Sequence, residues 1–159
     1  MPLMDRKPTG LLRLLLRAPI LLYRARAGWL LGHRFVYVAH RGRRTGARRE
    51  VVVEVVCYLP AAPEIAVVAA WGHHSDWYLN LKAGPALEVR ISTQVWRCPD
   101  HRFLGAAETI ELLCSYQRAH PRVWKRLAPM LGLPPDPQNT DLGAVHALVF
   151  TPSSSADHS

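Results

Sequence analysis

The sequence has few cysteines and no cysteine pair at a metal-binding spacing. Cys57, Cys98 and Cys114 are widely separated, and no C-x-x-C motif occurs. Isolated cysteines in odd number are typical of small core residues in a reducing compartment. His73, His74 and Asp76 lie close together, but a third, suitably spaced ligand is missing. The sequence therefore predicts a cytoplasmic protein without a metal site.

The common nucleotide and hydrolase motifs are also missing. No G-x-G-x-x-G follows a predicted strand, and no G-x-x-x-x-G-K-[ST] occurs, which excludes the usual dinucleotide and P-loop folds. Ser75 has no matching pattern of histidine and acidic partners, so a hydrolase triad is excluded as well.

The chain has no uncharged hydrophobic run long enough to cross a membrane. Residues 11–31 are strongly apolar, but Arg13, Arg17, Arg24 and Arg26 interrupt them before the ~18 residues that a span requires. The same charges argue against a secretory signal. Arg13, Arg17 and Arg24 fall on one stripe of a helix, so the pattern predicts an amphipathic helix over 11–31. Such a helix suits either an anionic membrane surface or a cover over the protein core.

Arginine, in contrast, is abundant. The formal net charge is +8, and 17 of the 20 basic residues are arginines. This balance favours an anionic partner, such as a phosphorylated cofactor, a membrane surface or nucleic acid. The scattered arginines are explained by contact with solvent alone. The cluster in residues 41–49 (RGRRTGARR) instead indicates an anionic partner.

Five arginines and two glycines share these nine positions, between two apolar runs. Glycine lets a turn direct its N–H groups at one point, and the arginine fork matches phosphate and carboxylate oxygens. The segment predicts an anion-binding turn. Because few aromatic residues interleave the cluster, nucleic acid is not expected as a partner.

A second segment, residues 75–81 (SDWYLNL), places two large rings beside polar groups. This arrangement suits a flat ligand, although aromatic residues also fill cores. We expect one of Trp77 and Tyr78 to be a core residue.

Hydrophobic periodicity predicts about six strands and four helices. The expected strands cover residues 33–40, 51–59, 65–71, 86–92, 94–104 and 145–151, with the fourth and fifth as a hairpin. The expected helices after the N-terminal one cover residues 77–83, 106–119 and 121–131. Strands and helices do not alternate regularly, so the fold class is mainly β (α+β), a mostly antiparallel barrel with outer helices. We expect one domain over 1–152 and a disordered tail over 153–159.

Three segments in this order resemble the deazaflavin-dependent nitroreductase family, part of the flavin/deazaflavin oxidoreductase superfamily. They are GRRTG (residues 42–46) with Arg49, then VVAA (67–70), then DWYLNLKA (76–83). Residues 116–121 (YQRAHP) and 131–134 (LGLP) are similar to one branch of it. The resemblance covers roughly residues 11–152. It implies a split β-barrel and the cofactor coenzyme F420, with FMN as the alternative.

The resemblance also implies where the cofactor is held. The turn residues expected to grip its phosphate and acidic tail are Arg43, Arg44, Thr45, Gly46 and Arg49. The residues expected along its ring are Val68, Ala69, Ala70 and Trp71, with Trp77, Tyr78 and Asn80 closing the site. Trp71 and the short loop 72–76 depart from the best-known members at the place where substrate would approach.

No acid–base pair is visible, which fits chemistry supplied by a cofactor. Tyr78, Tyr116 and Glu54 are the candidates for donating a proton to the product; packing is an equal alternative for Tyr116. Glu54 stands in an apolar strand, where an unpaired carboxylate is costly, so we expect it to pair with an arginine or to face the barrel mouth.

The expected function is therefore an oxidoreductase that passes hydride from reduced deazaflavin to a lipophilic, electron-poor acceptor such as a quinone, enone or nitro compound. The alternative is a carrier of deazaflavin, flavin, haem or bilin that does not turn over. Expected partners are the anionic cofactor, a small lipophilic substrate and a second copy of the chain. Residues 11–31 would add peripheral contact with the inner face of the cell membrane.

Overall fold

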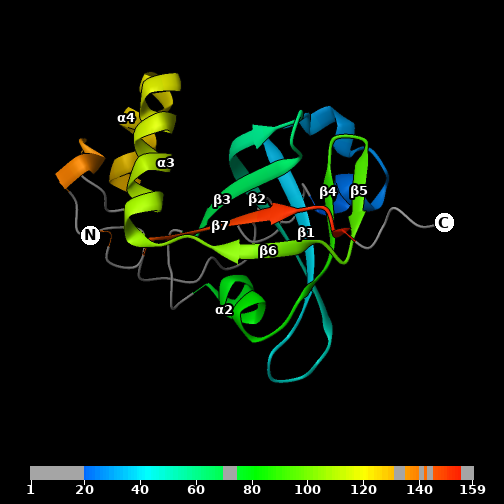
Figure 1. The fold of residues 1–159 in the computed structure, drawn as a ribbon. Coiled ribbons are helices and arrows are strands. Elements are labelled where there is room, and N and C mark those ends of the chain that lie inside the picture. Colours follow the sequence, from blue (N-terminus) through cyan, green and yellow to red (C-terminus); the bar gives the residue numbers. More distant parts are fainter. Residues whose placement is uncertain (1–19, 70–74, 131–134, 140–141, 143–144, 155–159) are drawn as a thin grey trace.

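The computed structural model describes residues 20–69, 75–130, 135–139, 142 and 145–154. Its centre is a seven-stranded sheet in which every neighbouring pair is antiparallel (Figure 1). The strands are β1 (Phe35–Arg41), β2 (Arg48–Leu59), β3 (Glu64–Ala69), β4 (Ala86–Ile91), β5 (Gln94–Arg97), β6 (Asp100–Phe103) and β7 (His146–Thr151). The helices are η2 (Gly28–Leu31), α2 (Asp76–Ala83), α3 (Ala106–Ala119), α4 (Pro121–Met130) and η4 (Pro137–Asn139).

The strand order shows that the sheet must curl. The order is β5-β4-β1-β2-β3-β7-β6, so β5 and β6 form opposite edges. Arg97 ends β5 and Asp100 begins β6, so at most about 11 Å of chain separates them. The edges of a flat seven-stranded sheet would lie about 29 Å apart. The sheet is therefore rolled into a nearly closed barrel, as a mainly β barrel fold predicts.

Strand β2 joins the two halves of the barrel. Its first half, through Glu54, pairs with β1, and its second half, from Val55, pairs with β3, with an irregularity between Val55 and Cys57. In the register of the first half, Val38 lies opposite Val51, and His40 lies opposite Arg49. These positions share the inner face of the barrel, so this face runs from the apolar core to a polar end.

Apolar residues on the inner faces form the main core. It contains fully buried side chains from β1, β3, β4 and β7, together with Tyr78 and Leu81 of α2. A second cluster lies where α3 and α4 pack on the outside of the sheet, and it includes Leu113, Tyr116 and Trp124. Helix α2 covers the end of the barrel near the β1–β2 turn (Figure 1).

Two expected elements are shorter than their hydrophobic patterns predict. The helix expected over 11–31 ends at residue 24, where Arg26 takes a positive φ of 58° and η2 follows; residues 11–19 lie outside the described part. The strand expected over 94–104 is two strands, because Cys98 also takes a positive φ (46°) and Pro99 has no N–H to donate. This break makes seven strands rather than six.

Candidate functional site

A cleft of about 480 Å³ opens at the polar end of the barrel. The arginine turn (residues 41–49), the ends of β1 and β2, and the first turns of α2 surround it. Its lining residues are His40, Gly42, Arg43, Arg44, Thr45, Arg49, Glu50, Val51, Asp76, Trp77 and Asn80. The structure thus brings together two segments that lie more than 25 residues apart and that the sequence analysis assigned to one ligand.

The arginine turn is closed by its own backbone. Gly42 N–H donates to Ala47 O at 2.8 Å, and Gly46 N–H donates to Gly42 O at 2.8 Å. Gly46 has a φ of 69°, in the left-handed region that glycine adopts without strain. Among the described residues, the backbone N–H groups of Arg44 and Thr45 have no partner. The turn therefore keeps two donors for a ligand.

The arginines of the cleft differ in how they are paired. Arg43 forms an ion pair with Asp76 at 3.2 Å. Within the described part of the chain, Arg44 and Arg49 have neither an ion pair nor a side-chain hydrogen bond, and both are exposed. These two guanidinium groups give the cleft its uncompensated positive charge.

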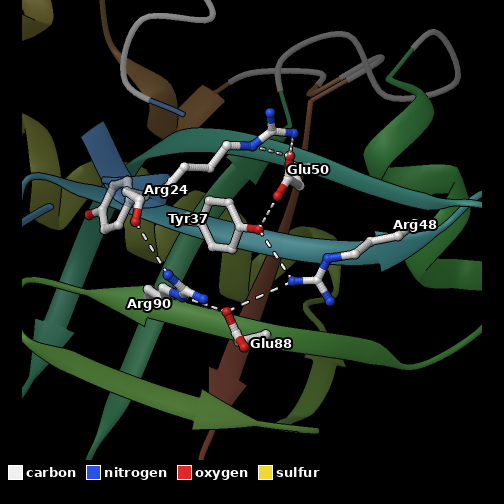
Figure 2. A network of polar contacts seen from close by, with 7 residues as sticks. Arg24, Tyr37, Arg48, Glu50, Glu88 and Arg90 are labelled. Atoms are coloured by element: carbon white, nitrogen blue, oxygen red, sulfur yellow. Dashed lines mark hydrogen bonds and ion pairs between the residues drawn. The ribbon is translucent and has the colours of Figure 1, made fainter. Parts of the chain in front are cut away.

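The second carboxylate of the cleft, Glu50, is held by other partners. Arg24 Nε donates to Glu50 Oε2 at 2.9 Å, and Tyr37 OH donates to Oε1 at 2.5 Å. Figure 2 shows this network continuing over the sheet through Arg48, Glu88 and Arg90. Burial alone would raise the pKa of Glu50, but these hydrogen bonds hold it below its usual range. Glu50 thus stays ionised without neutralising Arg44 or Arg49.

Asn80 and His40 form the buried floor of the cleft. Asn80 Oδ1 accepts from Arg43 N–H at 3.0 Å and from Arg43 Nη1 at 3.0 Å. Asn80 Nδ2 lies 3.2 Å from His40 Nδ1. Asn80, expected to touch the cofactor, thus has its amide engaged by protein groups on both sides.

The remaining predicted site residues lie elsewhere or outside the described part. Tyr78 lies in the core, stacked on His146 at 5.1 Å, whereas Trp77 is half-buried at the cleft. Val68 packs toward α3, and Ala69 faces the main core. Ala70 and Trp71 lie outside the described residues.

Glu54 and Tyr116 meet each other but do not line the cleft. Tyr116 OH donates to Glu54 Oε1 at 3.2 Å, and Arg34 Nε lies 3.7 Å from the same oxygen. Burial, followed by the charge of Glu54, raises the pKa of Tyr116 to about 12, so its hydroxyl stays protonated at neutral pH. Glu54 lies four residues along β2 from Glu50, about 13 Å away. The expected arginine partner of Glu54 is present.

Sequence reasoning missed the polar cleft residues His40 and Glu50. The alternation of side chains along β1 could have indicated His40. Val36, Val38 and His40 lie on the same face of the strand, so the imidazole of His40 is expected at the end of the core that Val36 and Val38 help to form. Glu50 lies on the opposite face of β2 from Arg49. Its position at the cleft depends on its contacts with Arg24 and Tyr37, which the sequence does not reveal.

Two further properties concern the described residues only. They contain no group of three or more histidine, cysteine, aspartate or glutamate side chains arranged to hold a metal ion. None of their helices has the length and apolar character needed to cross a membrane.

The described residues thus form a curled antiparallel barrel with an arginine-lined cleft at one end. The family model of F420H(2)-dependent quinone reductase matches residues 16–124, and the chain belongs to this family. This match confirms the resemblance to deazaflavin-dependent enzymes, and the family is one of F420-dependent oxidoreductases.

Solved structures show the same fold. One, described as an F420-H2 dependent reductase (FDR-A), has a TM-score of 0.52 and 20% identity, over 75% of this chain and 95% of its own. Another, described as a domain-swapped dimer, has a TM-score of 0.51 and 18% identity, over 84% of this chain and 99% of its own. A search of curated proteins finds no match.

Proposed function

We propose that this protein passes a hydride from reduced coenzyme F420 to a small lipophilic, electron-poor acceptor, such as a quinone, enone or nitro compound. The observation that carries the proposal is the pair Arg44 and Arg49, which line the cleft without an ion-pair partner in the described part of the chain. When bound, the reduced deazaflavin supplies the hydride.

The cleft fits such a cofactor by the chemistry of its donors. Arg44, Arg49 and two free N–H groups of the arginine turn suit a phosphate and a carboxylate-bearing tail. Trp77 offers an aromatic wall beside them. The two carboxylates of the cleft, Glu50 and Asp76, are engaged by other arginines and so repel an anion less.

Cofactor binding is tested by replacing Arg44 and Arg49 together with alanine. We expect coenzyme F420 affinity, followed by tryptophan fluorescence, to fall about 100-fold, because two charge-assisted contacts are lost. The matched control, Arg118→Ala with Arg122→Ala, removes the same charge from α3 and α4 and should bind normally. Unchanged affinity in a folded Arg44/Arg49 double variant would reject the assignment.

Catalysis is tested separately from binding. Oxidation of bound, reduced F420 in the presence of quinones, enones or nitroaromatics is followed by absorbance. Binding without oxidation by any acceptor would favour the carrier alternative. Saturable binding of FMN in preference to F420 would place the protein with flavin users.

Of the two tyrosine candidates for proton donation, both are buried and neither lines the cleft, but Tyr116 has its hydroxyl on a carboxylate. Its hydroxyl already donates to Glu54, a pair through which a proton can move. Tyr116→Phe should lower kcat and leave F420 affinity unchanged if the pair serves the reaction. An unchanged kcat would leave Tyr116 a packing residue of α3.

We also propose a peripheral membrane contact that would present a lipophilic acceptor to the protein. Leu21, Trp29 and Leu30 are exposed at 55%, 59% and 59%, with the exposed cations Arg24 and Arg34 near them in the chain. Trp29→Ser with Leu30→Ser should reduce co-sedimentation with phosphatidylglycerol vesicles. Leu59→Ser, at the exposed last residue of β2, is the control.

A homodimer is a further proposal. It is supported by β5 and β6, the two sheet edges that pair with no further strand among the described residues, and by the resemblance to the deazaflavin-dependent family. Light scattering of the purified chain tests it directly, since a monomer mass across the accessible concentrations would reject it.

A further inference from the structure

The amide of Asn80 has a defined orientation. Both groups that approach one end of it, Arg43 N–H and Arg43 Nη1, are obligatory donors, each at 3.0 Å. That end must therefore be the oxygen, and the NH₂ group must face His40 Nδ1 at 3.2 Å. The two Arg43 donors on one side of Asn80 thus determine that Asn80 presents a donor to His40 on the other side.

The orientation of Asn80 fixes the state of His40. Because Asn80 Nδ2 donates, His40 Nδ1 must accept, which requires a neutral imidazole with its proton on Nε2. His40 is 3% exposed, and burial lowers its pKa below 6.5. The Arg41 backbone opposes this shift, Arg49 across the β1–β2 pair adds to it, and Asp76 of α2 opposes it. Asn80 and the ion-paired Arg43 are the remaining polar groups near the ring.

We propose that His40 is a positioning residue which, through Asn80, holds the Arg43 end of the arginine turn in the geometry that binds the anionic cofactor. The chain of contacts runs from β1 to α2 and back to the turn that follows β1. Neutral His40 accepts from Asn80, and Asn80 accepts twice from Arg43. Protonation of His40 turns the acceptor at Nδ1 into a donor, so two donors face each other and the link opens.

The inference rests on the proposed function only in naming the ligand, and its pH dependence has a definite sign. The neutral form supports binding, so affinity is intact above the ordinary histidine pKa of about 6.5 and falls as the pH decreases below it. Two charged groups act on the ring: Arg49 disfavours the imidazolium, and Asp76, which is paired with Arg43, favours it.

The test compares wild type with His40→Asn and His40→Phe. Asparagine can place Oδ1 near the position of Nδ1 as an acceptor that does not titrate, whereas phenylalanine has no acceptor. At pH 7.5, we expect His40→Asn to bind F420 within about twofold of wild type and His40→Phe to bind about tenfold more weakly. Between pH 7.5 and 5.0, the wild-type affinity should fall more steeply than that of His40→Asn. The His40→Asn profile also corrects for any titration of the ligand itself.

A second readout needs no cofactor. Imidazole ¹⁵N shifts should show the Nε2–H tautomer of His40 at pH 7.5, and the Arg43 amide resonance should move in His40→Phe but not in His40→Asn. Asn80→Asp should raise the pKa of His40, because a carboxylate favours the imidazolium. If His40→Phe fails to fold, the pH profiles of wild type and His40→Asn still decide the test.

Four outcomes separate the two claims. Equal F420 affinity of folded wild type and His40→Phe, or identical pH profiles of wild type and His40→Asn, would overturn the positioning role. An Nδ1–H tautomer in wild type would overturn it as well. If wild type does not bind F420, the proposed function fails, and the Arg43 resonance then decides whether His40 still positions the turn.

Discussion

At the scale of single residues, the cleft shows how charge is kept available. Its two acidic neighbours point their carboxylates at arginines other than Arg44 and Arg49: Glu50 at Arg24, and Asp76 at Arg43. Arg44 and Arg49 are thereby left for a ligand. The Arg41–Arg49 composition predicts this turn because its signal is local. His40 escapes prediction because its role depends on Asn80, 40 residues away in the chain.

The Glu50 network should stabilise the fold in a pH-dependent way. Its carboxyl pKa is lower in the folded state than in the unfolded chain, so the stabilisation is present above about pH 4.5 and is lost as the pH falls through the folded value. Glu50→Gln should lower the free energy of unfolding at pH 7 by about 1 kcal/mol, since charge-assisted bonds to Arg24 and Tyr37 weaken.

Urea unfolding at pH 7 and pH 3.5 measures this effect. The same exchange at Glu111, an exposed position of α3, serves as the control and should change little. A deficit for Glu50→Gln that is as large at pH 3.5 as at pH 7 would contradict the ionic account.

At the scale of elements, prediction succeeds where glycine or proline marks the end of a helix or strand in the sequence. Helix α3 begins after Gly105 and ends before His120-Pro121, and the structure has the predicted bounds 106–119. Prediction fails where a residue other than glycine takes a positive φ, as at Arg26 and Cys98. Such a residue type rarely takes this conformation, so the sequence does not indicate the break. The N-terminal helix and the fifth strand were overextended for this reason.

The contact between the N-terminal helical segment and η2 gives a prediction at this scale. A Cβ on Gly28 would overlap the ring of Tyr23, which is 2% exposed and donates its hydroxyl to Phe35 O at 2.7 Å. Gly28→Ala should therefore cost roughly 1–3 kcal/mol by overpacking and lower Tm by about 2–4 °C for each kcal/mol.

Calorimetry checks this expectation against Gly84→Ala, where a Cβ meets no atom within 4 Å and the backbone is extended. Equal Tm values for the two variants would show that the segment gives way without cost and is not fixed by Tyr23.

At the scale of the whole molecule, the net charge of +8 should act together with the cleft. Coenzyme F420 is polyanionic, so its affinity should fall about tenfold between 50 and 500 mM NaCl as the Debye length shortens. The Arg44→Ala/Arg49→Ala variant should show a clearly shallower dependence, and the Arg118→Ala/Arg122→Ala control should keep the wild-type slope. Fluorescence titrations at four salt concentrations measure all three slopes; equal slopes would assign the attraction to overall charge rather than to the cleft.

The position of β7 has a consequence for the order of assembly. Among the described residues, β7 is the last strand in chain order, yet it lies between β3 and β6 in the sheet (Figure 1). During synthesis, the hairpins β1–β2, β2–β3 and β4–β5 can form from neighbouring segments. Until residues 146–151 are available, β3 and β6 each keep one edge whose backbone hydrogen-bonding groups are unpaired. The nascent chain is therefore most exposed to intermolecular strand pairing before β7 leaves the ribosome, and insertion of β7 joins β3 to β6.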